Sequence, residues 1–243
     1  MTVSPPAMKG KGEHILRILA DIPRPRRVAV LLRHAERDEA KPDGTAHHDS
    51  DGLQLTQAGH EAARRLGREL PAVSALYLSY TKTPRTRETA EDLQAGFRQA
   101  HPTLAIDMGG AEAFLSTFQC ASLDSPTRMR LKRSLGGGKR LLREWFDGNL
   151  PREDIRPVQE ARDRMLGLVV EKLRRSPSDS LGLLVTHDFA IILLRDWLFD
   201  LRFEDCAWPA VLDGIVFSEE EKGSLRATWR ERTVAVPEVR AHA

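Results

Sequence analysis

Cysteine is scarce in this sequence. The 243 residues include two cysteines, Cys120 and Cys206, which lie far apart in the chain. Two such residues indicate neither a disulfide framework nor a metal-binding motif, so we expect a reducing compartment. The first twelve residues lack the apolar core of a signal peptide, and no stretch is apolar for long enough to span a membrane. We therefore expect a cytoplasmic protein without a membrane partner.

An excess of charge of one sign is also absent. The chain has 37 Lys and Arg against 35 Asp and Glu, which gives a formal net charge of +2. This balance provides no general attraction to nucleic acid, so we expect no nucleic-acid partner, and any anion binding must be local. Hydrophobic residues make up 41% and charged residues 30%, as in globular proteins. The length fits one large α/β domain over residues 1–243.

An apolar run near the start of the chain leads directly into a cluster of charge. Residues 28–32 read Val-Ala-Val-Leu-Leu and predict a strand that is buried on both faces. Arg33, His34 and Arg37 follow within five residues. In an open α/β sheet, ligands bind at the carboxyl ends of the strands. Two arginines beside a histidine at such an edge favour an anion site over a solvated charged turn.

Strand and helix patterns alternate along the rest of the chain. This order favours an α/β fold with a mainly parallel sheet and helices on both faces. Residues 109–157 interrupt the alternation, and we expect them to form a mostly helical insertion that covers the site. The expected strands are 73–78, 104–106, 180–186, 211–219 and 224–234, and the expected helices are 14–21, 56–70, 83–97, 158–174 and 189–199.

A polar loop at residues 38–53 follows the charged cluster. His47, His48, Asp49 and Asp51 lie in it and could bind a metal ion. Flexible loops rarely preorganise ligands, and the fixed spacings of known metal sites are missing here. We therefore expect no metal and no cofactor.

A second histidine and a second basic cluster also follow predicted strands. His187 follows Thr186, which ends an apolar run at residues 181–185. Arg85 and Arg87 open the helix after the strand at 73–78, and a helix N-terminus itself favours anions. Because parallel strands end at one edge, we expect His187 to meet His34 and the arginines there.

Four motifs follow one another along the chain: Arg33-His34-Ala35, residues 55–63, residues 81–90, and Leu184-Val185-Thr186-His187. In this order they resemble the histidine phosphatase superfamily, which includes phosphoglycerate mutases and histidine acid phosphatases. The corresponding motifs of that family are Arg-His-Gly, Leu-Thr-x-x-Gly-x-x-Gln/Glu-Ala, Ser-x-x-x-Arg-Ala-x-Gln-Thr-Ala, and an apolar strand with the second histidine. The likeness of the third motif selects Arg85 over Arg87 as a phosphate ligand.

The resemblance implies a phosphoglycerate mutase-like fold and a chemistry that fits these residues. His34 is then the nucleophile, and His187 donates a hydrogen bond to the phosphoryl oxygens. The phosphate-binding residues are Arg33, Arg37 and Arg85. Positioning and charge stabilisation dominate phosphoryl transfer, and guanidinium groups near His34 lower the pKa of its ring.

The general acid has two candidates. Glu112 lies where the mutase-like branch carries its acid. Asp188 follows the second histidine, as in the acid phosphatase branch, and Arg37 also matches that branch, although Asp38 replaces its usual proline. We favour Glu112, since the chain is short for an acid phosphatase and Asp188 also suits a helix cap.

The expected function is a metal-independent phosphatase that acts on a small phosphorylated substrate through a phosphohistidine on His34. Mutase activity is a weaker alternative, because residues 35–38 lack the Gly-Glu-Ser/Thr and Asn of mutases of similar length. A non-catalytic phospho-ligand-binding module is disfavoured by the full set of histidines and arginines. A phosphohistidine protein phosphatase needs an open site, which the insertion disfavours. The insertion's basic residues fit a solvated helical face better than a second phosphate site; they include Arg128, Arg130, Lys132, Arg133, Lys139 and Arg140.

Overall fold

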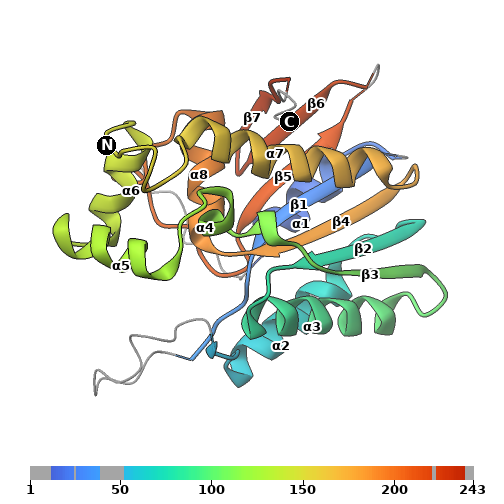
Figure 1. Ribbon diagram of the computed structural model, residues 1–243. Coiled ribbons are helices and arrows are strands. Elements are labelled where there is room, and N and C mark those ends of the chain that lie inside the picture. Colours follow the sequence, from blue (N-terminus) through green and yellow to red (C-terminus); the bar gives the residue numbers. More distant parts are fainter. Residues whose placement is uncertain (1–11, 25, 39–51, 221–222, 239–243) are drawn as a thin grey trace, which may run out of the picture.

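A seven-stranded sheet forms the centre of the computed structural model, which describes residues 12–24, 26–38, 52–220 and 223–238 (Figure 1). The strand order is β3-β2-β4-β1-β5-β6-β7. Strands β3, β2, β4 and β1 pair in parallel. Antiparallel pairs join β5 to β1, β6 to β5 and β7 to β6. Since β6 thereby runs in the direction of β1, five strands share one direction, which confirms the mainly parallel sheet. The bounds are β1 Arg27–Arg33, β2 Ala75–Tyr80, β3 Ala105–Ala111, β4 Ser180–Thr186, β5 Gly214–Glu219, β6 Leu225–Trp229 and β7 Arg232–Ala235.

Helices cover both faces of the sheet, as predicted (Figure 1). In β1, Val28 and Leu32 pack into the core below α1, α2 and α3, whereas Ala29 and Leu31 pack into the core below α7 and α8. Alternate side chains of a strand point to opposite faces, so an unbroken apolar run is what a strand between two helical layers requires. These helices are α1 Glu13–Asp21, α2 Gln57–Glu69, α3 Pro84–Ala100, α7 Val158–Arg175 and α8 Asp188–Phe199.

Local signals set the starts of α2 and α3. The hydroxyl of Thr56 accepts a hydrogen bond from the Gly59 amide at 2.9 Å, which makes Thr56 the expected N-cap. Pro84 is the first residue of α3, where its missing N–H costs no hydrogen bond. Both helices begin where the sequence predicts.

The prediction of a single strand over residues 224–234 is wrong. It is two strands, β6 and β7, that pair antiparallel across a tight turn in which Trp229 faces Arg232. Arg230 takes a left-handed backbone conformation with φ of 54°. Gly or Asn usually marks such a turn, and neither residue is present here, so the local sequence carries no turn signal.

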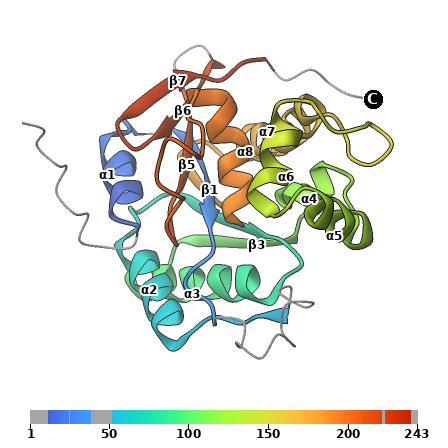
Figure 2. The ribbon, with the colours of Figure 1, turned by 90° about the vertical axis from the view of Figure 1, so that its left-hand side faces the viewer.

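Residues 112–157 contain short helices beside α8 (Figure 2). Gly109, Gly110 and Ala111 still belong to β3, so the irregular segment starts after the boundary drawn at residue 109. The division of the chain into a domain and an insertion stays a prediction. Among the described residues, none of the helices combines the length and apolar character that crossing a membrane requires. The elements of this segment are η3 Ala113–Leu115, α4 Thr117–Cys120, α5 Ser125–Ser134 and α6 Gly138–Phe146.

Candidate active site

The register of the parallel strands brings their carboxyl ends together. Arg33, the last residue of β1, pairs with Thr186, the last residue of β4. Tyr80 of β2 pairs with Val185 on one side and with Ala111 on the other. The residues that follow these strands therefore leave the sheet along a single edge. They are His34, Thr81, Glu112 and His187.

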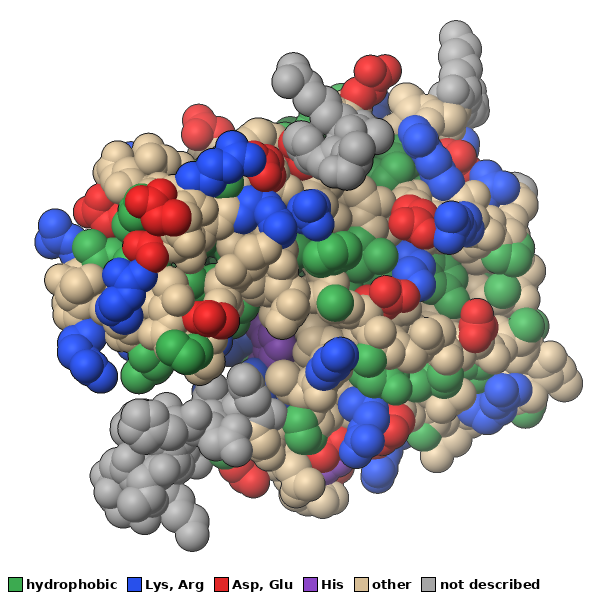
Figure 3. All heavy atoms as spheres, viewed as in Figure 1, with side chains coloured by type: hydrophobic (Ala, Val, Ile, Leu, Met, Phe, Trp, Pro, Cys, Tyr) green, Lys and Arg blue, Asp and Glu red, His purple; other side chains and the backbone are tan. Residues whose placement is uncertain are grey.

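A cavity of about 730 Å³ opens at this edge, and every residue predicted for the site lines it. Figure 3 shows a hollow with a histidine side chain visible in it. Cavities of about 300–1,000 Å³ hold small-molecule ligands. The structure thus brings the predicted residues together, while their catalytic roles stay predictions. They are Arg33, His34, Arg37, Arg85, Glu112, His187 and Asp188.

His34 is buried and held from two sides. Its backbone amide donates to the Thr186 carbonyl at 3.0 Å, which continues the pairing of β1 with β4. Its Nδ1 lies 2.7 Å from the Ala35 carbonyl oxygen. A carbonyl oxygen only accepts hydrogen bonds, so Nδ1 carries the proton and Nε2 keeps its lone pair. Burial, and then the charges of Arg85 and Arg33, lower the pKa of His34 to about 3. The ring is therefore a neutral base at neutral pH.

His187 lies beside His34, with ring centroids 5.4 Å apart. Its Nδ1 is 3.3 Å from Nη2 of Arg85, which can only donate, so Nδ1 accepts and Nε2 carries the proton. That Nε2 donates to the Thr81 hydroxyl at 3.1 Å. Burial and the charge of Arg85 hold the pKa of His187 well below its usual range. The predicted hydrogen bond from His187 to a phosphoryl oxygen requires its proton to leave Thr81.

Arg33 is fixed at both terminal nitrogens of its guanidinium group. Its Nη1 donates to the Pro209 carbonyl at 2.5 Å. Its Nη2 forms an ion pair with Oδ2 of Asp188 at 3.2 Å. The guanidinium group is therefore preorganised before any ligand arrives.

The carboxylate of Asp188 accepts hydrogen bonds on both oxygens. Oδ1 accepts from the Phe189 amide at 2.9 Å, and Oδ2 accepts from Trp208 Nε1 at 2.9 Å. Oδ2 also takes part in the ion pair with Arg33. The N-cap of α8 is His187, and Asp188 is its first helical residue. The interpretation of Asp188 as the cap residue is thus wrong by one position, although its side chain does bind an amide of the first turn.

Glu112 reaches the cavity from the end of β3. Its amide donates to the Tyr80 carbonyl at 2.8 Å, which continues the pairing of β2 with β3. Its Oε1 accepts a hydrogen bond from the Lys172 ammonium group of α7. Among the described residues, no second partner is found for its carboxylate.

The two arginines at the start of α3 lie in different surroundings. Arg85 is 7% exposed and lines the cavity. Arg87 lies on the exposed face of α3 and forms an ion pair with Glu91, 3.6 Å away. The motif therefore selects the arginine that faces His34. Arg37 also lines the cavity, and its Nη1 donates to the Asp38 carbonyl at 2.9 Å.

Three contacts at the site were not anticipated from the sequence. Thr81 binds His187, the Trp208–Pro209 segment holds Asp188 and Arg33, and Lys172 pairs with Glu112. Thr81 stands at the serine position of the third motif, which was a usable signal. The other two contacts join residues 20 to 176 positions apart, and no local pattern marks them.

The described part of the chain contains no group of three or more His, Cys, Asp or Glu side chains that could hold a metal ion. The alternative metal ligands of the sequence, His47, His48, Asp49 and Asp51, lie outside the described residues.

Comparison with known proteins identifies the family of this chain. The sequence model of the histidine phosphatase superfamily (branch 1) matches residues 29–213. The chain belongs to the histidine phosphatase superfamily. None of the curated proteins compared with it matches. This superfamily member is instead similar to solved structures, which are under 25% identical to it and so show the shared fold alone.

Two of these structures come from different organisms. A mycobacterial glucosyl-3-phosphoglycerate phosphatase is 19% identical, with a TM-score of 0.52 over 85% of this chain and 98% of its own. YhfR from Bacillus stearothermophilus is 18% identical, with a TM-score of 0.52 over 82% of this chain and 93% of its own.

Proposed function

We propose that this superfamily member is a phosphoric monoester hydrolase that needs no metal ion and forms a phosphohistidine on His34. The observation that carries the proposal is the state of the His34 ring. Its Nδ1 proton is bound to Ala35, its pKa is about 3, and its Nε2 lone pair is therefore available at neutral pH. A histidine in this state is a nucleophile, and cationic residues line the cavity around it.

The reaction then runs in two displacements. Nε2 of His34 forms a bond to phosphorus while the bond from phosphorus to the ester oxygen breaks, and that oxygen leaves with a proton from a general acid. Water next attacks the phosphohistidine, gives up a proton to the same group and releases orthophosphate. Arg33, Arg37 and Arg85 hold the outer phosphoryl oxygens, where the charge of the transition state is spread.

Glu112 is our candidate for the general acid. Both oxygens of Asp188 already accept hydrogen bonds, from the Phe189 amide and from Trp208. Asp188 also forms an ion pair with Arg33, so protonating Asp188 would disturb the position of Arg33. Glu112 has one side-chain partner, Lys172, and its second oxygen is available. Asp188 is then a positioning residue for Arg33.

The first test is hydrolysis of an aryl phosphate with and without a chelator, by the unmodified protein and by His34→Ala. We expect activity that resists the chelator and is absent in the variant. Brief incubation with substrate, followed by mass spectrometry under alkaline conditions, should add one phosphoryl group to the peptide that contains His34.

Other outcomes would support other functions. Loss of activity with chelator would contradict the metal-free reaction. Transfer of the phosphoryl group to an added alcohol in preference to water would indicate a mutase. Binding of phosphate esters with no turnover of any of them would indicate a phospho-ligand-binding module.

A further inference from the structure

The cavity continues well beyond the two histidines. Its distant wall comes from α4 and α5 and includes Phe118, Arg128 and Lys132, which line the same cavity as His34. Its volume of about 730 Å³ lies in the range that holds whole small-molecule ligands. Much of this space is therefore available to the alcohol part of a substrate whose phosphoryl group lies at His34.

The lining is far more basic than the chain as a whole. Six cationic and three acidic side chains line the cavity, although the full chain carries a net charge of only +2. The acids are already engaged, since Asp188 pairs with Arg33, Glu112 pairs with Lys172 and Asp124 caps α5. Among the described residues, no carboxylate forms an ion pair with Arg128 or Lys132.

Arg128 is held in position without being neutralised. Its guanidinium carbon lies 4.3 Å from the centroid of the Phe118 ring, and its Nη2 lies 3.4 Å from the Ser125 hydroxyl. Stacking on an aromatic ring fixes the plane of the guanidinium group and leaves its edge free to donate hydrogen bonds. Lys132 follows four residues later on α5, so it lies on the same face of the helix.

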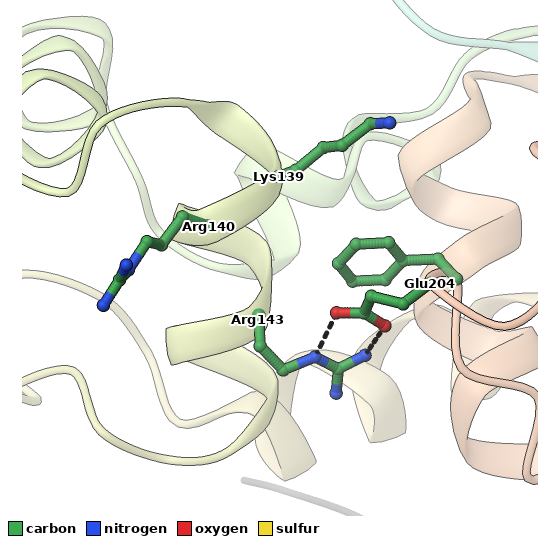
Figure 4. Close-up of a pocket in the computed structure, with 5 residues that line it drawn as sticks. Lys139, Arg140, Arg143 and Glu204 are labelled. Atoms are coloured by element: carbon green, nitrogen blue, oxygen red, sulfur yellow. Dashed lines mark hydrogen bonds and ion pairs between the residues drawn. The ribbon is translucent and has the colours of Figure 1, made fainter.

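The other basic residues of the insertion do not line this cavity. Arg130 pairs with Asp154. Lys139 and Arg140 line a separate hollow in which Arg143 donates to both carboxylate oxygens of Glu204 (Figure 4). In that hollow the carboxylate of Glu204 already pairs with Arg143. The sequence alone favoured a solvated helical face for all of these residues, and the cavity sets Arg128 and Lys132 apart.

We propose that Arg128 and Lys132 bind a second oxyanion, a carboxylate or a phosphate, on the alcohol part of the substrate. The substrate class is then a phosphomonoester with at least two anionic groups. The inference rests on the proposed function, since it assumes that the phosphoryl group lies at His34. Charge-assisted hydrogen bonds from this pair should raise the affinity for such a substrate about 10- to 100-fold over an ester without the second anion.

Three esters of the same size class test the proposal: phenyl phosphate, 4-carboxyphenyl phosphate and 1,4-phenylene bisphosphate. We expect kcat/KM to be at least about tenfold higher for one or both of the compounds with a second anionic group than for phenyl phosphate. In the double variant Arg128→Ala/Lys132→Ala, the ratio of kcat/KM for these compounds to kcat/KM for phenyl phosphate should fall to about one. Arg133→Ala is the matched control, because Arg133 is an exposed residue of α5 that does not line the cavity. The compound that is preferred identifies the oxyanion.

Dissociation constants measured by calorimetry in the His34→Ala background separate this proposal from the proposed function. A preference for the esters with a second anionic group that depends on Arg128 and Lys132 supports the second binding site, even if the unmodified protein hydrolyses none of them. Equal binding of the three esters, or a preference that survives in the double variant, would overturn the proposal. Hydrolysis of phenyl phosphate with equal binding would leave the proposed function intact and remove the second site.

Discussion

Nδ1 of His34 lies 2.7 Å from the carbonyl oxygen of Ala35, the next residue in the chain. The contact fixes the ring of a buried histidine whose pKa is lowered from 6.5 to about 3, with burial as the largest cause. The Ala35 carbonyl thus selects the tautomer of the His34 ring, a role that a carboxylate plays in many other sites. The consequence is a base that stays neutral far below the usual range of histidine.

The free energy of unfolding should therefore depend on the protonation of His34 between pH 6.5 and about 3. Above pH 6.5, His34 is neutral in both the folded and the unfolded chain, and it adds no pH dependence. Between pH 6.5 and about 3, the unfolded chain binds a proton that the folded chain does not, so the free energy of unfolding falls as the pH falls. From pH 6.5 to 5 this amounts to about 2 kcal/mol, at about 1.4 kcal/mol per pH unit. Urea unfolding of the unmodified protein and of His34→Asn should give a smaller loss for the variant; equal losses would contradict the lowered pKa.

Arg85 and Arg87 provide a matched pair of substitutions on one helix turn. Arg85→Lys removes a forked donor that faces His34 and His187, and we expect kcat/KM to fall about 10²- to 10³-fold. Arg87→Lys changes an exposed residue paired with Glu91 and should leave kcat/KM unchanged. The inhibition constant of orthophosphate should weaken in the first variant alone. Similar effects in both variants would argue against the assignment of Arg85.

Glu112 and Asp188 can be separated by the leaving group. A general acid matters most when the departing alcohol is a poor leaving group. Glu112→Gln should thus lower kcat about 10²- to 10⁴-fold for an alkyl phosphate and far less for p-nitrophenyl phosphate. Asp188→Asn should lower activity toward both esters by the same factor, because it acts through the position of Arg33. The reverse pattern would make Asp188 the acid.

The sequence predicts the parts of this site that depend on local order. The apolar run before Arg33 identifies β1, and the run before His187 identifies β4. Parallel pairing of these two strands then places His34 and His187 side by side. This inference needs only the direction of the strands and the rule that ligands bind at their carboxyl ends.

Contacts between distant segments could not be predicted in the same way. Lys172 lies in the last turn of α7 and meets Glu112 only through the tertiary packing of that helix. Trp208 and Pro209 belong to an irregular segment after α8, and the composition of that segment does not distinguish a supporting wall from an ordinary loop. Such contacts depend on how helices pack, which periodicity does not specify.

Gly59 shows how a motif residue can support the site from outside it. The glycine of the second motif lies in α2, where a Cβ atom would stand 2.1 Å from the carbonyl oxygen of Glu36, two residues after His34. Gly59→Ala must therefore push α2 away from the segment that carries the nucleophile. We expect the free energy of unfolding to fall by about 1–3 kcal/mol, as for other overpacked positions.

Activity should also fall in Gly59→Ala, measured at a temperature where the variant is fully folded, because the displaced segment is the one that fixes the His34 ring. Gly138→Ala is the control for the exchange itself. Its new Cβ would meet nothing closer than Lys132 Cε at 3.8 Å, and alanine is the better helix former at the start of α6. The free energy of unfolding of that variant should be unchanged or slightly higher. If Gly59→Ala behaved like Gly138→Ala, the close approach of α2 to Glu36 would not be what positions His34.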